Sequence, residues 1–211
     1  MSGMTRRARV CATLGAALAA ALAVSVVSAQ QPQTQRVRGT VEAVDGAVLT
    51  VKSRDGQTSY KVKLTDNAAV RGIIKAALTD IKDNSFIGVT GMPQADGSQK
   101  AVEIHIFPEP MRGTGEGHRP WDLVPNSTMT NATVAQMVKG VSGEEIMLKY
   151  KDGEKKIVVA PETVIVTYVP GSKDELKPGA KIFIAAAQKK DDGTLEAAAV
   201  SVGRDGITPP M

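Results

Sequence analysis

Apolar and polar residues alternate along most of the chain after residue 36, and this pattern predicts β-strands rather than amphipathic helices. In the first such stretch Val37, Gly39, Val41 and Ala43 occupy every second position. Asp-Gly pairs interrupt the alternation and are typical of tight turns, because glycine adopts a positive φ at no steric cost. The first half therefore predicts five strands, near residues 37–43, 49–51, 60–64, 86–89 and 101–107.

The alternation weakens between the third and fourth of these strands. Residues 73–81 allow one or two helical turns, or a strand followed by a short helix. The second half repeats the order of the first. Its strands are predicted near residues 133–138, 145–150, 155–159, 181–187 and 195–202, with a looser segment at 161–179.

The two halves also resemble each other residue by residue. The segment Leu49-Thr50-Val51-Lys52 precedes Asp55-Gly56, just as Ile146-Met147-Leu148-Lys149 precedes Asp152-Gly153. We interpret residues 36–107 and 131–203 as two copies of one module. The predicted fold is all-β: two small five-stranded OB-like barrels in tandem, each with a short helix or turn between strands 3 and 4. An SH3-like barrel and a small open sandwich are the alternatives.

Modules of about 70 residues bury only modest cores. Without disulfides or a metal, we expect the two modules to pack against each other for stability.

Residues 1–29 have the pattern of a secretory signal peptide. Three arginines precede residue 10, an apolar run extends from Val10 to Val27, and small residues end the segment at Ala29. We expect cleavage near Ala29 and an N-terminal tail at 30–35, which predicts a periplasmic or secreted protein. A permanent membrane anchor is the alternative interpretation of the same run.

Removing this segment changes the charge of the protein. The 211-residue chain has a net charge of +4, from 26 basic and 22 acidic residues, and a single cysteine, Cys11. Three basic residues and the cysteine precede residue 30, so the mature chain has a net charge of +1 and no thiol. Near neutrality and scattered aromatic residues argue against a nucleic-acid partner. No apolar stretch beyond the signal reaches the ~18–20 residues of a membrane span.

The turn and core residues resemble those of DUF5666, a bacterial family of small exported β-domains of unknown function. The similarity covers Gly39-Thr40-Val41, Val44-Asp45-Gly46, Leu49-Thr50-Val51, Ile81-Lys82-Asp83-Asn84 and the closing Asp96-Gly97. The second half departs from it, with Ala132 in place of the opening glycine. The resemblance implies two OB-like barrels and export. It supplies no catalytic residues.

The joining segment 108–130 is rich in proline and glycine, which is typical of a linker. It contains His118-Arg119-Pro120-Trp121-Asp122, with the only tryptophan of the chain. Exposing so large a ring to water is unfavourable, so we expect Trp121 to dock between the modules. Arg119, Trp121 and Asp122 are therefore candidates for a ligand site or an interface. Residues 204–211 are predicted to be a C-terminal tail.

A metal site is a second candidate. Glu103 and His105 lie two residues apart on a predicted strand, so their side chains share a face. His118 and Met111 are the further ligands that could approach them. A solvent-facing histidine beside a glutamate is the simpler interpretation.

No nucleophile–base pair is recognisable in the sequence. We therefore predict no catalytic residues and no cofactor.

Together these patterns predict an exported, non-catalytic binding or scaffolding protein of the bacterial periplasm. Its partner would be an unknown envelope protein or a small ligand. A periplasmic metal-handling accessory protein is the alternative, and an envelope hydrolase is a weaker one. The sequence predicts no particular oligomeric state.

Overall fold

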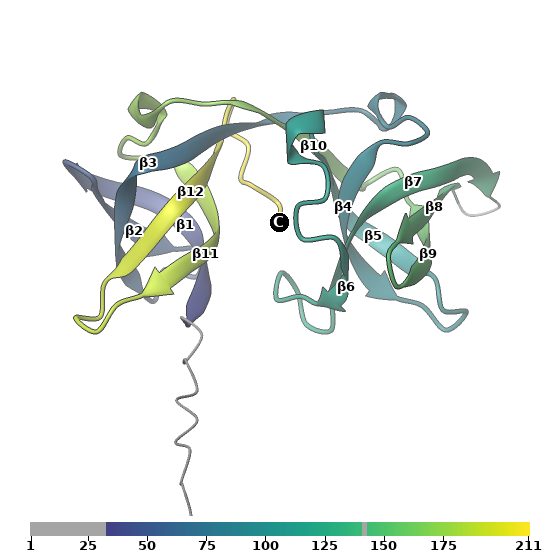
Figure 1. Cartoon of the computed structure of the whole chain (residues 1–211), viewed down its shortest axis with the longest axis horizontal. Coiled ribbons are helices and arrows are strands. Elements are labelled where there is room, and N and C mark those ends of the chain that lie inside the picture. Colours follow the sequence, from purple (N-terminus) through teal and green to yellow (C-terminus); the bar gives the residue numbers. More distant parts are fainter. Residues whose placement is uncertain (1–32, 141–142) are drawn as a thin grey trace, which may run out of the picture. The chain divides into compact units, whose positions relative to one another are not determined.

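The computed structural model describes residues 33–140 and 143–211, and this part of the chain is all-β (Figure 1). The predicted signal peptide and residues 30–32 of the predicted N-terminal tail lie outside the described residues, and the rest of that tail leads into the first strand at Thr34. No helix in the described part has the length and apolar character needed to cross a membrane. The only helical segments within residues 33–140 and 143–211 are three single turns: η1 (Leu78–Asp80), η2 (Glu109–Met111) and η3 (Lys173–Glu175).

All ten predicted strands are present, and two further strands join them. The strands are β1 (Thr34–Asp45), β2 (Val48–Ser53), β3 (Ser59–Lys75), β4 (Phe86–Pro93), β5 (Gln99–Ile106), β6 (Gly117–Pro120), β7 (Thr128–Gly140), β8 (Gly143–Tyr150), β9 (Gly153–Val159), β10 (Val164–Pro170), β11 (Lys181–Lys189) and β12 (Leu195–Gly203). The added strands are β6, inside the predicted linker, and β10, inside the second looser segment. The first looser segment forms the end of β3 followed by the short helix η1.

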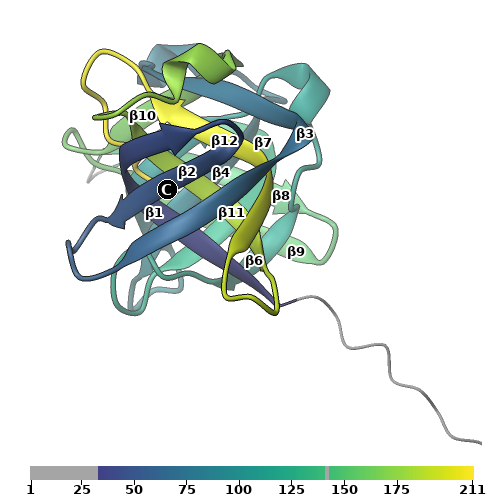
Figure 2. The ribbon, with the colours of Figure 1, turned by 90° about the vertical axis from the view of Figure 1, so that its left-hand side faces the viewer.

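Five strands form a closed barrel, which we call the first barrel (Figure 2). Within it β1 pairs antiparallel with β2 and β11, β2 pairs with β3, and β11 pairs with β12. A parallel pairing between β12 and β3 completes the ring. Closure removes the free edges that a five-stranded sheet would otherwise expose.

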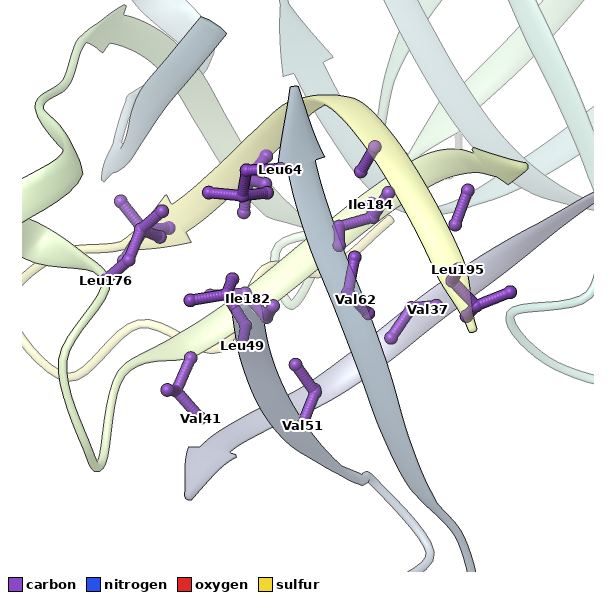
Figure 3. Close-up of a cluster of buried hydrophobic side chains, with 14 residues drawn as sticks. Val37, Val41, Leu49, Val51, Val62, Leu64, Leu176, Ile182, Ile184 and Leu195 are labelled. Atoms are coloured by element: carbon purple, nitrogen blue, oxygen red, sulfur yellow. The ribbon is translucent and has the colours of Figure 1, made fainter. Parts of the chain in front are cut away.

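The interior of the first barrel is filled by small and branched apolar side chains, drawn in Figure 3. They come from every second position of the strands, as the alternation in the sequence predicts. They include Val37, Leu49, Val62, Ile182 and Ile184, each no more than 1% exposed.

A second set of five strands, β9–β8–β7–β4–β5, is called here the second strand group. Neighbours in this order are paired antiparallel. β5 also pairs with β9, in parallel, at Gln99↔Ile157 and Lys100↔Val158. Its apolar core includes Ile87, Ile104 and Ile146.

Each set of strands draws on both halves of the sequence. The first barrel combines β1–β3 with β11 and β12, and the second strand group combines β7–β9 with β4 and β5. Equivalent residues of the two repeats are exchanged in the same way. Ile81 of the first repeat packs into the core of the second strand group, and Leu176 of the second repeat packs into the first barrel. The prediction that residues 36–107 and 131–203 each close a module on their own is therefore wrong.

The physical reason lies in β3, which is longer than the alternation predicts. Its first part pairs with β2, whereas residues 71–75 pair antiparallel with residues 166–170 of β10. β10 pairs in parallel with β5, from Val164↔Glu103 to Thr167↔Ile106. The chain thus leaves the first barrel before β4 begins. A third apolar cluster, around Ile73, Met129 and Val166, lies where these strands meet.

A half-buried ion pair links η3 to the end of β12. Arg204 donates to both carboxylate oxygens of Glu175, at 2.8 and 3.0 Å, and also to the carbonyl of Pro170. The Arg204 hydrogen bonds, with a further one from the backbone N–H of Ser172, lower the pKa of Glu175 to about 2. A carboxylate with a lowered pKa stabilises the fold only while it is ionised.

The exchange of strands predicts that neither half folds alone. A fragment covering 33–125 lacks the strands that close the first barrel, and one covering 126–211 lacks β4 and β5. We expect each to be unfolded or self-associated, and a mixture to recover the circular dichroism and cooperative unfolding of the intact chain. A monomeric fragment 33–125 that unfolds cooperatively by itself would contradict the exchange.

The Glu175–Arg204 pair predicts an acid-dependent loss of stability. Its contribution is fully present above the ordinary glutamate pKa of 4.5 and is lost as the pH falls towards 2. Urea unfolding of the protein and of Glu175→Gln should differ at pH 7 and converge as the pH approaches 2. Asp174→Asn, at the exposed neighbouring position, is the control. A difference that does not change with pH would count against this assignment.

Candidate functional site

The outer face of the second strand group carries four of the nine buried polar residues of the described chain. On β5, Ile104 points into the core, so Glu103 and His105 on either side of it face outwards. The register of the sheet places Glu103 beside Thr90 of β4, and His105 beside Gly88. β7 continues the same face with Met129 and Asn131, and β6 adds Arg119.

The outer face of the first barrel carries three arginines. Arg36 and Arg38 flank the inward-pointing Val37 of β1. One row across the sheet runs from Arg38 to Phe183, Ser201 and Arg71. The next positions of β11 and β12 hold only alanines, Ala185 and Ala199, which leave space above the sheet.

These two outer faces line a common cavity of about 660 Å³. That volume is typical of a small-molecule site. The loop between η2 and β6 and the side chains of Trp121 and Met211 complete its wall. A larger hollow of about 830 Å³ lies elsewhere, around Lys75, Glu144 and Glu162.

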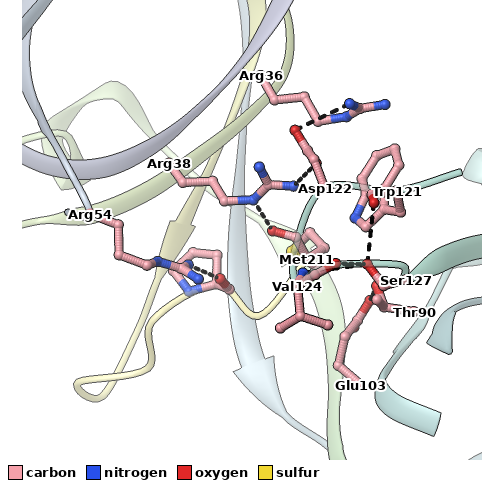
Figure 4. Close-up of polar contacts among 11 residues, drawn as sticks. Arg36, Arg38, Arg54, Thr90, Glu103, Trp121, Asp122, Val124, Ser127 and Met211 are labelled. Carbon is pink, nitrogen blue, oxygen red and sulfur yellow. Dashed lines mark hydrogen bonds and ion pairs between the residues drawn. The ribbon is translucent and has the colours of Figure 1, made fainter. Parts of the chain in front are cut away.

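Trp121 is half-buried in the wall of this cavity and packs against the third apolar cluster. The Arg36 guanidinium carbon lies 3.7 Å from the centroid of the indole ring, and that of Arg119 lies 5.6 Å away. Cations at such distances are attracted to the negative face of the ring. Trp121 is therefore held by arginines from β1 and β6. Figure 4 shows Arg36 and Asp122 beside Trp121.

Asp122 neutralises part of this positive charge. Its carboxylate accepts a hydrogen bond of 2.7 Å from Arg38 and lies 3.3 Å from Arg36. Partial burial opposes ionisation of Asp122, but the hydrogen bond and the charges of the two arginines outweigh it and lower its pKa. Arg38 also donates to the backbone carbonyl of Met211, at 2.8 Å, so the C-terminal segment is tied to β1.

Arg119 has no carboxylate partner among the described residues. Its side chain donates to the carbonyl of Gly115, at 2.7 Å. Burial and then the nearby charge of Arg36 lower the pKa of Arg119. Two guanidinium groups that repel each other in a partly buried site favour the binding of an anion between them.

Glu103 and His105 form a buried pair, with 1% and 3% exposure. The imidazole Nδ1 lies 3.2 Å from each carboxylate oxygen, and the hydroxyl of Thr90 donates to the same carboxylate at 2.7 Å. The interpretation of His105 as solvent-facing is therefore wrong. Since β10 pairs with β5 and the cavity wall covers this face, an outward position on the strand does not reach water.

Gly88 makes room for the imidazole. A Cβ atom at this position would overlap Nε2 of His105 and would also lie 2.7 Å from Oδ1 of Asn131. A glycine is therefore required beneath the ring.

Aromatic rings enclose His105 on its other sides. Its ring lies edge-on to those of Phe107 and Tyr168, with centroids 4.8 and 5.8 Å away, and the latter two are stacked at 5.5 Å. Burial, with a smaller effect from the charge of Glu103, raises the pKa of the Tyr168 hydroxyl. This end of the cavity is therefore apolar and aromatic.

Three buried side-chain atoms lack a hydrogen-bond partner among the described residues: Nε of Arg36, Nε1 of Trp121 and Oδ1 of Asn131. All three belong to residues that line the 660 Å³ cavity. Buried polar groups are nearly always paired in native proteins, so unpaired ones call for an explanation. Their concentration around one cavity is the strongest indication of a binding site in the structure.

The predicted metal ligands do not gather into one centre. His118 is bonded through Nδ1 to the hydroxyl of Thr130, at 2.8 Å, on the face of β7 opposite to Asn131. Burial, and then the charges of Lys155 and Arg119, lower its pKa. Met111 lines the cavity with His105, whereas Glu103 lies behind the imidazole. Across the described ranges, no group of three His, Cys, Asp or Glu side chains is arranged to hold a metal ion.

Of the predicted ligand-site residues, Arg119 and Trp121 line the cavity, and Asp122 pairs with its arginines. Sequence reasoning missed Arg36, Arg71 and Asn131. In the sequence, these residues are marked only by their position next to inward-pointing strand residues. Most side chains at such positions face solvent, so the position alone does not indicate a site.

Comparisons of this chain with models of protein families, with characterised proteins and with solved structures found no match. The resemblance to DUF5666 stays a prediction.

The packing around Gly88 predicts that Gly88→Ala destabilises the protein by about 1–3 kcal/mol, because overpacking displaces the imidazole from Glu103. Urea unfolding measures this change. In a His105→Ala background the same substitution should cost less, because the overlapping ring atom is absent. Equal costs in the two backgrounds would show that the ring does not set the requirement for glycine.

Proposed function

We propose that this chain is an exported, non-catalytic binding protein of the bacterial periplasm, and that the 660 Å³ cavity is its ligand site. The observation that carries the proposal is the set of three unpaired buried polar atoms around this one cavity. Two are donors and one is an acceptor. A ligand that pairs with them would remove a cost that the unliganded protein bears.

The site has the composition of a small-molecule pocket. Seven of its 18 lining residues are Phe, Tyr, Trp or Met, and polar groups converge on it. Its residues come from both sets of strands and from the segment that joins the two repeats. Such a site therefore forms only when both sets of strands and the joining segment are folded together.

We further propose that both sets of strands are OB-like barrels. In the first barrel we number β1, β2, β3, β11 and β12 as strands 1 to 5, and in the second strand group we number β7, β8, β9, β4 and β5 in the same way. The order around each ring is then 1-2-3-5-4-1. Strands 3 and 5 are parallel, and strands 1 and 4 are antiparallel. This is the order of an OB barrel, whose members bind varied ligands. The signal-like N-terminus and the resemblance to DUF5666 support export.

A neutral dye can test for binding in the cavity. Phenylnaphthylamine becomes fluorescent in apolar surroundings and should bind the folded protein. Ala199→Leu extends a side chain into the cavity, and we expect it to weaken dye binding roughly tenfold or more. Ala185→Leu narrows the same cavity from β11 and provides an independent second variant.

Ala198→Leu is the matched control, since Ala198 is exposed and does not line the cavity. Thermal unfolding should show that all three variants fold. Equal binding by Ala199→Leu, Ala185→Leu and Ala198→Leu would place the dye elsewhere and overturn the proposed site.

A further inference from the structure

The charges around the cavity are unequally distributed. Arg36, Arg71 and Arg119 line it, against the single carboxylate of Glu116. A carboxylate oxygen of Glu116 already accepts a hydrogen bond of 3.0 Å from the backbone of Lys151. Asp122 is shared between Arg36 and Arg38. The site as a whole therefore retains an excess of positive charge.

This excess is concentrated at one end. Glu103 lies behind His105, whose ring contacts that of Tyr168, and Arg71 pairs with Pro170, two residues along β10 from Tyr168. Arg36 and Arg119 lie together around Trp121, and strands β11 and β12 lie between β1, which carries Arg36, and β3, which carries Arg71. The aromatic end is therefore close to neutral, and the tryptophan end is positive.

The unpaired donors lie at the positive end. Nε of Arg36 and Nε1 of Trp121 each carry one N–H with no acceptor among the described residues. A carboxylate or sulfonate has acceptor capacity for both, and hydrogen bonds to a charged acceptor are stronger than those between neutral groups. A cation bound here would be repelled by the guanidinium groups of Arg36 and Arg119.

From this polarity we infer that the cavity selects an organic anion with a flat apolar body. Its carboxylate or sulfonate would lie between Arg36, Arg119 and the Trp121 indole. Its body would lie along Phe107, Tyr168 and Met111. The inference rests on the proposed function and names the class of ligand that the site takes.

The test compares naphthoate with naphthylmethanol and naphthylmethylammonium, substituted at the same ring carbon. These probes share one apolar body and differ in charge. Calorimetric titration should give binding of naphthoate at least roughly tenfold tighter than that of the alcohol, and weakest binding for the ammonium. Added salt should weaken the binding of naphthoate and leave that of the alcohol unchanged.

The single tryptophan locates the ligand. In nitrogen-labelled protein, its one indole N–H signal should move downfield with naphthoate, as expected when the donor gains an acceptor. The alcohol should move it less. A sulfonate of the same ring distinguishes a general preference for anions from a preference for carboxylates.

Arg119→Gln should reduce the preference for naphthoate over the alcohol to within about threefold, and Arg119→Lys should restore part of it. Arg112→Gln is the matched control, since Arg112 belongs to the same joining segment but is exposed and paired with Glu109. An equal loss in Arg119→Gln and Arg112→Gln would overturn the inference.

Failure of the inference and failure of the proposed function give different results. If phenylnaphthylamine binds in the cavity while naphthoate binds no better than the alcohol, the anion preference is wrong and the binding function stands. If neither the dye nor any naphthyl probe is affected by Ala199→Leu, both are wrong.

Discussion

The parallel pairing of β3 with β12 closes the first barrel with a strand from the far end of the chain. The hairpin of β4 and β5 completes the second strand group from the opposite direction. Strands pair through backbone hydrogen bonds, so a set of strands drawn from both halves forms only when both halves fold together. It also explains how two short repeats without a cysteine between residues 33 and 211 bury enough apolar surface. Neither repeat encloses a core by itself.

The exchange also creates the cavity. Where β3 passes from one set of strands towards the other, its last residues pair with β10 and bring the two outer faces together. One face carries arginines above a floor of alanines, and the other carries a buried glutamate and histidine beside aromatic rings. The joining segment places Trp121 and Arg119 between these faces. A segment with the composition of a flexible linker thereby becomes an ordered wall.

Electrostatics then distinguishes the two ends of the cavity. Glu103 is satisfied by His105 and Thr90, and Asp122 by two arginines, so the acidic groups around the site already have partners. Arg119 has only a backbone carbonyl, and an indole N–H lies near it without an acceptor among the described residues. Unpaired donors and positive charge therefore coincide at one place. This coincidence, rather than the size of the cavity, indicates what kind of ligand it takes.

The sequence by itself determined ten of the twelve described strands and the Asp-Gly turns, because alternation and turn chemistry are local, and it showed two similar halves. It also singled out Trp121 and Arg119, because a lone tryptophan in a proline- and glycine-rich segment is unusual. Only the tertiary structure decided which strands pair with which, since the same alternation suits closure within a repeat or between repeats. It likewise decided that Arg36, Asn131 and His105 border a cavity. An outward-facing residue meets water or another sheet depending on what covers it, and that depends on contacts between residues far apart in the chain.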